Sequence, residues 1–424
     1  MNLKHLQHFG YRFKSPIFYF ICIFTIVICW MWQRDTIMDQ QLNGHSSPLH
    51  DATIEQTKNM LENISLLSKT QDYTGHDDDA NKPLRIESLN PALLPSNDAV
   101  TTTATSQKRL IIIGDVHGCK ASLDALLEKL SFAPDHDHLI FTGDLINKGP
   151  DSLGVVDLAR KYSASSVRGN HEDRILRLRQ EMMAQSEESS SSTEDESESE
   201  EEEKGEKEIG KKPDKNDEKK KDKKEKKEKK KEKKKLKKKE KKEKKKDKKD
   251  KKDKKDKKGK DQKGGKEARE RHLALQLSDK QAQWLESCPM ILKLGWIRGM
   301  GEVVVVHAGL LPDIELEKQD PWNVMNMRSV DFDKKKVLDS HQGTMWARLF
   351  NKHYSTMASK NVDSAASTMT VIYGHDSKTG LAISDYTKGL DSGCVKGEKL
   401  TALVIEVGGK QSLVQQKCRD DVKE

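Results

Sequence analysis

The stretch that decides the fold is IIIGDVHG, residues 111–118, in which an apolar run ends at a glycine followed by Asp115 and His117. A buried strand that ends in a sharp turn would present both side chains at the edge of a sheet. The pattern returns at Gly143-Asp144 and at Gly169-Asn170, each after a short apolar run. Spacings of 29 and then 26 residues between these polar positions suit βα crossovers between neighbouring parallel strands.

The same pattern occurs twice more, after a long charged interruption. The apolar runs at 303–306 and 370–373 lead into His307 and His375. In an open α/β sheet, the loops at the carboxyl ends of the strands converge on one crevice. We therefore expect an α/β domain with a polar cluster at one sheet edge.

These polar residues predict a metal centre. The six candidate ligands are Asp115, His117, Asp144, Asn170, His307 and His375. Their oxygen and nitrogen atoms suit Zn, Mn, Co or Fe. A single histidine is more often a core or surface residue, but five clusters in register after five strands favour two cations. Asp144 is the natural bridge, with the two ligands before it completing one site and the three after it the other. Such a pair of cations can activate a shared water and hold a phosphoryl oxygen.

A resemblance to a known family rests on GDVHG (114–118), GDLINKG (143–149), GNHE (169–172), the His307 and His375 stretches, and GLDSGC (389–394). Together these motifs resemble the calcineurin-like metallophosphoesterases. The likeness is strongest to the phosphoprotein-phosphatase branch, which includes bacterial diadenosine tetraphosphatases. The resemblance implies a β-sandwich flanked by helices, in place of a simple parallel sheet, with two divalent cations at the sheet edges and Zn favoured.

The resemblance also implies roles outside the ligand set. His171 matches the general acid of the family, and a cationic imidazole with a pKa of about 6.5 can protonate a leaving oxygen. Asn147 and Lys148 stand where the family usually has aspartate and arginine. We expect Asn147 to accept a hydrogen bond from His171 without adding charge, and Lys148 to bind phosphate as a mobile point charge. Arg348 matches a second phosphate clamp, and a surface salt bridge is the simpler alternative for it.

The N-terminal region predicts a membrane anchor. Residues 16–32 carry no charge and end in tryptophans, and residues 1–15 are basic with no acidic residue. The span is at the short limit for crossing about 30 Å of hydrocarbon, tryptophans suit the interface, and no small-residue cleavage site follows. We expect a single-pass signal anchor with residues 1–15 in the cytosol and the rest in a lumen. A cleaved signal peptide or a buried helix is the alternative.

Residues 33–107 are polar and predict a disordered stem between membrane and domain. The stem contains one sequon, Asn63-Ile64-Ser65, which would be open to glycosylation in a lumen. The six cysteines lack CxxC spacing, which argues against a tetrathiolate zinc site and a dense disulfide framework and leaves room for one bridge.

An insertion, residues 186–267, is expected to divide the domain into 108–185 and 268–418, with 419–424 as a tail. The insertion is acidic and serine-rich and then lysine-rich, a composition that cannot form a core and predicts disorder. Residues 219–258 contain 29 lysines and 10 acidic residues, against a net charge of +8 for the whole chain. The basicity is therefore that of one tract, not of a nucleic-acid-binding face on the domain. A solubilising role is the simpler interpretation, and salt-sensitive binding of a polyanion is the alternative.

The anchor, stem and catalytic block together resemble the zinc-dependent vacuolar endopolyphosphatases of budding yeasts, which cut within chains of inorganic polyphosphate. The resemblance implies hydrolysis of internal phosphoanhydride bonds, inorganic polyphosphate as the substrate, and the vacuole membrane as the location. A dinucleoside-polyphosphate hydrolase and a serine/threonine phosphoprotein phosphatase are the enzymatic alternatives. The non-enzymatic alternative is a membrane-tethered pseudoenzyme that acts as an adaptor, and the intact ligand set argues against it.

Overall fold

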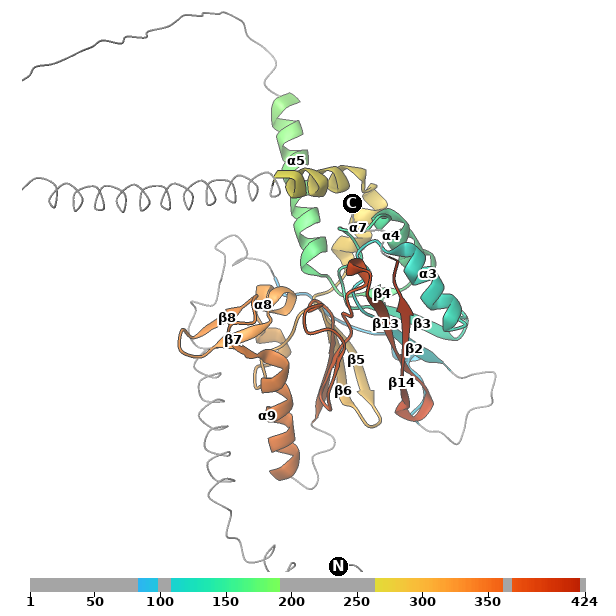
Figure 1. Ribbon diagram of the computed structural model, residues 1–424, viewed down its shortest axis with the longest axis vertical. Helices are drawn as coiled ribbons and strands as arrows, with labels where there is room; N and C mark the ends of the chain where they lie inside the picture. Colours follow the sequence, from blue (N-terminus) through green and yellow to red (C-terminus); the bar gives the residue numbers. More distant parts are fainter. Residues whose placement is uncertain (1–82, 98–107, 191–263, 361–367, 420–424) are drawn as a thin grey trace, which may run out of the picture. The chain divides into compact units, whose positions relative to one another are not determined.

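Two β-sheets pack against each other across a shared apolar layer (Figure 1). The computed structural model describes residues 83–97, 108–190, 264–360 and 368–419.

The first sheet has the IIIGDVHG strand at its centre. Its strands, in spatial order, are β14 (Gln411–Lys417), β13 (Lys399–Ile405), β2 (Arg109–Ile113), β3 (Asp137–Phe141) and β4 (Ser165–Ser166). β2, β3 and β4 run parallel, and β13 runs antiparallel to β2. The loops that follow β2, β3 and β4 therefore leave the sheet at the same edge.

The second sheet provides the other half of the sandwich. Its strands, in spatial order, are β1 (Ile86–Ser88), β5 (Ile291–Ile297), β6 (Gly301–Val306), β10 (Met369–Tyr373), β12 (Thr387–Gly389) and β11 (Ala382–Ile383). β6 and β10 are parallel neighbours, so the loops after them also leave together. A small third sheet consists of β8 (Lys336–Leu338), β7 (Ser329–Asp331) and β9 (Thr344–Met345).

The alternation of side chains along β2 explains the layers. Leu110 and Ile112 lie in the apolar cluster between the sheets, with Val305 of β6. Ile111 and Ile113 belong to the cluster on the opposite face of the first sheet. A strand that is buried on both faces has a continuous apolar sequence, which is why β2 lacks a polar/apolar alternation.

Helices cover the outer face of the first sheet (Figure 1). They are α3 (Lys120–Lys129), α4 (Ser152–Lys161), α5 (Asn170–Ser190), a helix at 264–276, and α7 (Asp279–Ser287). α7 begins at a capping box in which Ser278 and Gln281 exchange hydrogen bonds with each other's backbone N–H. α4 begins at Asp151, whose carboxylate accepts a hydrogen bond from the Gly154 N–H at 2.8 Å.

The outer face of the second sheet packs against α9 (Trp346–Lys360). The indole of Trp346 meets the ring of Tyr373 on β10 edge-on, with 4.8 Å between the ring centroids. The remaining helical segments are α8 (Pro321–Asn326), η3 (Pro91–Leu93), η5 (Leu316–Lys318), η7 (Cys394–Lys396) and η8 (Val407–Gly409). A disulfide joins Cys394 in η7 to Cys418 just after β14, which is one bridge of the kind the sequence left open.

The predicted α/β sandwich with flanking helices is confirmed, and two predicted boundaries need correction. β1 pairs in parallel with β5, so the expectation of a disordered stem over 33–107 is wrong for this segment. A three-residue strand is too short to give a periodic signal. At the insertion, α5 continues to Ser190, past the predicted limit at 185, and residue 264 is already helical, ahead of the predicted limit at 268.

Several predictions fall outside the described residues. They concern the anchor at 16–32 with its flanking tail, the sequon at Asn63, and the lysine tract at 219–258. Among the helices of the described ranges, none combines the length and apolar character needed to cross a membrane.

Candidate metal centre

Loops after five strands bring the predicted ligands together. Asp115 and His117 follow β2, Asp144 follows β3, Asn170 begins α5 after β4, His307 follows β6, and His375 follows β10. All of them except Asn170 are at most 7% exposed. Residues from both sides of the insertion thus meet in one buried cluster.

Asp144 lies between two groups of these side chains. Its Oδ2 lies 3.4 Å from His117 Nε2, which lies 4.0 Å from Asp115 Oδ2. Its Oδ1 lies 3.4 Å from His307 Nε2, and the same nitrogen is 3.2 Å from both Asn170 Oδ1 and His375 Nδ1. One carboxylate oxygen of Asp144 therefore faces His117, and the other faces His307.

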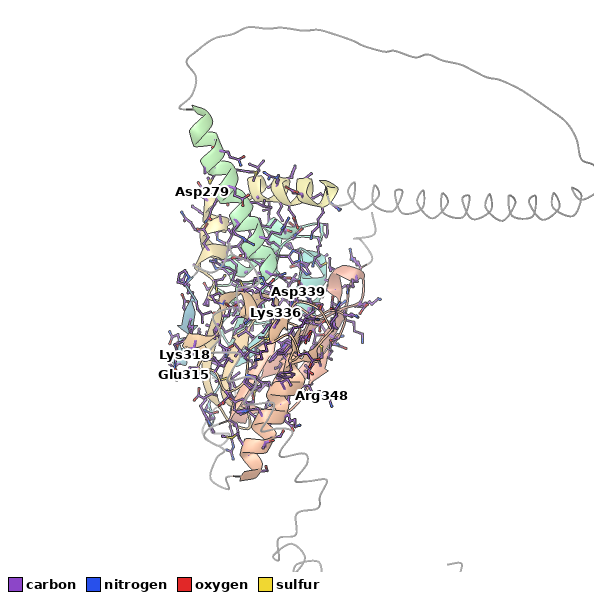
Figure 2. The ribbon with its side chains drawn as sticks, turned by 90° about the vertical axis from the view of Figure 1, so that its left-hand side faces the viewer. Asp279, Glu315, Lys318, Lys336, Asp339 and Arg348 are labelled. Atoms are coloured by element: carbon purple, nitrogen blue, oxygen red, sulfur yellow. A yellow bond between two sulfur atoms is a disulfide. The ribbon has the colours of Figure 1, made fainter. Side chains whose placement is uncertain are left out.

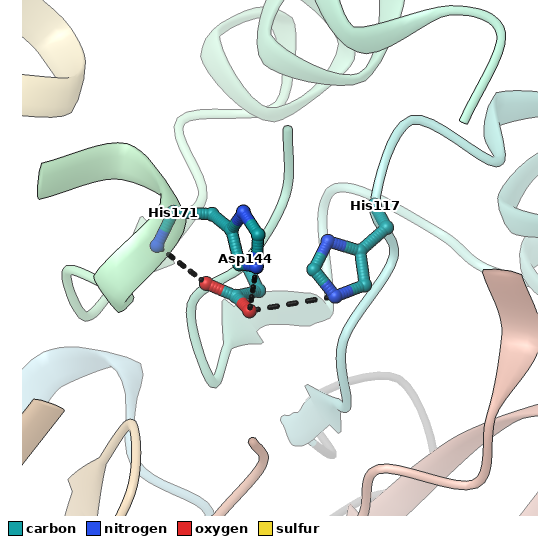
Figure 3. A group of neighbouring side chains, drawn as sticks. All are labelled: His117, Asp144 and His171. Carbon is teal, nitrogen blue, oxygen red and sulfur yellow. Dashed lines mark hydrogen bonds and ion pairs between the residues drawn. The ribbon is translucent and has the colours of Figure 1, made fainter. Parts of the chain in front are cut away.

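Figure 3 shows the carboxylate of Asp144 between His117 and His171. The backbone N–H of His171 donates to Asp144 Oδ1 at 3.1 Å, and His171 Nε2 lies 3.9 Å from Asp144 Oδ2. Ligand atoms within 4.8 Å of one another form two sets: His117, Asp144 and His171, and Asp115, Asp144 and His307. Asp144 is common to both, as a bridging ligand would be.

Backbone carbonyls fix the tautomers of the histidines. His117 Nδ1, His307 Nδ1 and His375 Nε2 each lie within 3.2 Å of a backbone carbonyl oxygen. Because a carbonyl oxygen can only accept, each of these nitrogens carries the ring proton. The opposite nitrogen then turns its lone pair toward the cluster, which is the arrangement of metal-ligating histidines.

The backbone itself directs these side chains. His117, Asp144 and His375 have φ values of 47°, 50° and 69°, in the left-handed region that non-glycine residues rarely adopt. Such conformations cluster at functional sites. Next to His375, a Cβ on Gly374 would lie 2.0 Å from Asp115 Oδ1, so only glycine permits this close approach.

Burial dominates the electrostatics of the cluster. It raises the pKa of Asp144 to about 7 and, together with the nearby carboxylates of Asp391 and Asp144, holds the pKa of Asp115 well above its ordinary value. It lowers the pKa of His307 to about 4. Burial thus disfavours the charged form of each group, and divalent cations bound among these oxygen and nitrogen atoms would offset that penalty for the carboxylates. The residues present fit two divalent cations with mixed oxygen and nitrogen coordination.

The hydrogen bond between Asn147 and His171 runs in the opposite direction to the predicted one, with Asn147 as the donor. Asn147 Nδ2 lies 2.8 Å from His171 Nδ1 and donates to Glu270 Oε1 at 3.2 Å, while Asn147 Oδ1 accepts from the Lys148 N–H at 2.8 Å. The buried Glu270 carboxylate orients the amide with its NH₂ group toward His171. The expectation that Asn147 accepts a hydrogen bond from His171 is therefore wrong.

This contact places the proton of His171 on Nε2, the nitrogen that faces Asp144. Burial, followed by the charges of His117 and Lys148, lowers the pKa of His171 well below its ordinary value. Both observations favour a neutral imidazole whose N–H points to the cluster, and the role of His171 as general acid stays a prediction.

The two predicted phosphate-binding residues have different surroundings. Lys148 Nζ lies 2.9 Å from His117 Nε2, at the rim of the cluster. Arg348 is exposed in the first turn of α9 (Figure 2). Within the described residues Arg348 has no carboxylate partner at ion-pair distance, which gives no support to the salt-bridge alternative. Its clamp role stays a prediction.

Three further buried carboxylates, outside the predicted ligand set, support the cluster. Glu172 accepts hydrogen bonds from the backbone of the Asp144 loop, Asp391 lies beside Asp115, and Glu270 holds Asn147. Glu172 ends the GNHE motif and Asp391 lies in GLDSGC, so the family motifs could have indicated both. Glu270 lies 123 residues from Asn147, and no local pattern marks it.

Comparison with known proteins gives a consistent picture. The sequence profile described as calcineurin-like phosphoesterase matches residues 108–376. A serine/threonine-protein phosphatase 1 of Salmonella typhimurium is 42% identical over 73 residues, 17% of this chain and 34% of the relative. A symmetrical bis(5'-nucleosyl)-tetraphosphatase of Pectobacterium atrosepticum is 48% identical over 67 residues, 15% of this chain and 24% of the relative. The chain thus spans about a quarter to a third of the length of these relatives.

Among solved structures, a putative diadenosine tetraphosphatase is similar with a TM-score of 0.46 and 24% identity, over 78% of this chain and 98% of the other.

Proposed function

Because this chain belongs to the calcineurin-like phosphoesterase family, we propose that it is a metal-dependent endopolyphosphatase, which hydrolyses internal phosphoanhydride bonds of inorganic polyphosphate. Family members use two divalent cations, and the buried clusters around Asp144 could bind them. Zn is our first choice for the metal because imidazole and carboxylate ligands both suit it.

The observation that carries the choice of bond is the donation from Asn147 to His171. A protonated His171 would point an Nδ1–H at the NH₂ group of Asn147, so the contact favours the neutral ring. A neutral imidazole is a weak acid, and expulsion of a serine alkoxide needs a strong one. A phosphate leaving group has a second pKa of about 6 and departs as an anion without a proton. The geometry therefore favours phosphoanhydrides over phosphoserine esters.

Different residues of the chain would have different roles in this reaction. Asp115, His117, Asp144, Asn170, His307 and His375 would hold the cations, which when bound supply an activated water and neutralise phosphate charge. Lys148, at the rim of the cluster, would bind a phosphate oxygen. His171 would donate an Nε2–H hydrogen bond to the leaving phosphate, and Arg348 would bind phosphate from α9.

The proposed location is the vacuole membrane, with a single-pass anchor, a cytosolic N-terminus and a luminal catalytic domain. The disulfide between Cys394 and Cys418 supports this proposal because such bridges persist in oxidising compartments.

Digestion of long-chain polyphosphate by the purified full chain tests the proposal, with the products sized on a gel. We expect mid-length fragments, loss of activity on chelation, and loss of activity in His117→Ala and Asn170→Ala. Diadenosine tetraphosphate and a phosphoserine peptide are the competing substrates. A higher kcat/KM on either of them, with polyphosphate left intact, would refute the substrate assignment. Full activity in both ligand variants would refute the metal mechanism.

A further inference from the structure

A groove of about 870 Å³ opens beside the candidate metal centre. One side is formed by the loop at 147–151 and the first turn of α4, and the other by the helix at 264–276. Asn147 and Lys148 line its inner end, and both also contact the cluster, Asn147 through His171 and Lys148 through His117. The groove therefore adjoins the candidate metal centre through these two residues.

The helix wall of the groove is basic. Lys266, Arg269 and His272 line it, and all three are exposed. Their spacing of three residues places them along one side of the helix, over a rise of about 9 Å. Lys148 adds a positive charge from the opposite side.

The charges of this groove are only partly paired. Lys266 Nζ lies 3.7 Å from Glu270 Oε1, and Arg269 Nε donates to the Gly265 carbonyl oxygen at 3.4 Å. Asp151 is the acidic residue of the lining, and its carboxylate caps α4. Among the described residues, no carboxylate lies at ion-pair distance from Arg269 or Lys148. Both side chains can therefore bind an anion.

The helix wall is held firmly from its other side. Glu270 of this helix is 1% exposed and accepts from Arg174 Nε of α5 at 2.6 Å. Arg179, also on α5, donates to the carbonyl oxygens of Ala274 and Leu277 at 3.1 and 2.7 Å. Figure 1 shows the helix at 264–276 crossing α5 at this point. The row of basic side chains is thus presented by a fixed element.

We propose that this groove binds the stretch of a linear polyphosphate chain next to the bond that is cut, with Arg269 and Lys266 contacting successive phosphates. The inference rests on the proposed function, since it names where that substrate continues beyond the metal centre. A polyanion carries charge on every phosphate and matches a row of basic side chains. Phenylalanine, tyrosine and tryptophan are absent from the described residues that line the groove, so basic groups rather than large aromatic rings dominate its polar lining.

The test compares Lys266→Ala/Arg269→Ala with a control that removes the same charge elsewhere, Lys318→Ala/Lys336→Ala. Both control residues are exposed, on η5 and β8 (Figure 2). For long-chain polyphosphate, we expect the groove variant to raise KM about 10-fold. For tripolyphosphate, which is too short to extend along the groove, we expect a much smaller rise. The control should match wild type on both substrates.

A binding measurement separates this inference from the proposed function. Binding of long-chain polyphosphate to the His307→Ala chain is measured by calorimetry across a salt series, with and without the groove substitutions. We expect weaker binding and a shallower salt dependence, by a slope of about 0.7 for each lost phosphate contact. If wild type does not cut polyphosphate but the groove substitutions still weaken its binding, the groove is supported and the proposed activity is refuted. Equal affinity and salt slope in the groove and control variants would overturn the groove.

Discussion

Asn147 and Glu270 form a buried pair in which the amide donates to the carboxylate at 3.2 Å, and the same amide group faces His171 Nδ1. The pair links the loop after β3 to the helix that follows the insertion.

Exchange of the two functional groups tests this pair. Asn147→Asp alone places two carboxylates in contact inside the fold, and we expect it to lower the free energy of unfolding by about 1–3 kcal/mol. Adding Glu270→Gln supplies a donor to the new Asp and should restore most of that loss. Urea unfolding of the wild type, both single variants and the double variant measures the coupling. Additive effects of the two substitutions would show that the pair does not interact.

The exchanged pair should also change the preference for leaving groups. In Asn147→Asp/Glu270→Gln, the new Asp accepts from His171 Nδ1–H, so the ring can become cationic. We expect the ratio of kcat on a phosphoserine peptide to kcat on polyphosphate to rise about tenfold, because general acid catalysis helps the alkoxide more. An unchanged ratio would mean that His171 does not protonate the leaving group.

Loss of the central carboxylate should affect both metal positions. Asp144→Asn removes charge from the residue whose two oxygens face His117 and His307. We expect the bound metal, measured by mass spectrometry after dialysis, to fall from two ions per chain to at most one, with loss of hydrolysis. Asp339→Asn is the matched control, because Asp339 is exposed (Figure 2) and is outside the candidate ligand set. Two tightly held ions in Asp144→Asn would contradict the bridging role.

Glu172 should be essential to the shape of the Asp144 loop. Its carboxylate accepts from the N–H groups of Asp144, Ile146 and Gly169 at 2.8, 3.2 and 2.9 Å. Glu172→Gln turns an NH₂ group toward these donors, so we expect the free energy of unfolding to fall by about 1–3 kcal/mol. Glu181→Gln, exposed on the same helix, should change it little. Similar melting curves for the two variants would argue against this role.

The disulfide should stabilise the end of the first sheet. Cys418→Ser removes the link between η7 and the residues after β14, and we expect a loss of about 2–4 kcal/mol. Wild type under reducing conditions should show the same loss, and Cys394→Ser/Cys418→Ser should be no less stable than the single variant. If a reductant leaves the melting temperature of wild type unchanged, the bridge contributes nothing.

The strands that carry the candidate ligands could be predicted from the sequence better than the short strand at the edge of the second sheet. The strands before Asp115, Asp144 and His307 are buried apolar runs that end in ligand-type residues, a signal that is local and strong. β1 is only three residues long, and its place in the sheet depends on pairing with β5, about 200 residues later. Long-range pairing of this kind leaves no local pattern.

The same division applies to the site. The six candidate ligands were visible because each follows a strand. The direction of the Asn147 hydrogen bond could not be predicted from the sequence, because it depends on Glu270, on the far side of the insertion. Glu270 itself resembles any acidic residue of a charged helix until the fold buries it.

The left-handed backbone at His117, Asp144 and His375 has a consequence for metal identity. These directions are built into the chain by turns and by the absence of a side chain at Gly374. A site shaped in this way keeps its donor geometry whichever divalent ion arrives. Exchange of one first-row metal for another should therefore change the rate of hydrolysis without changing the conformation of the loops. The ion bound in the cell would then depend on which metals its compartment supplies as much as on selection by the protein.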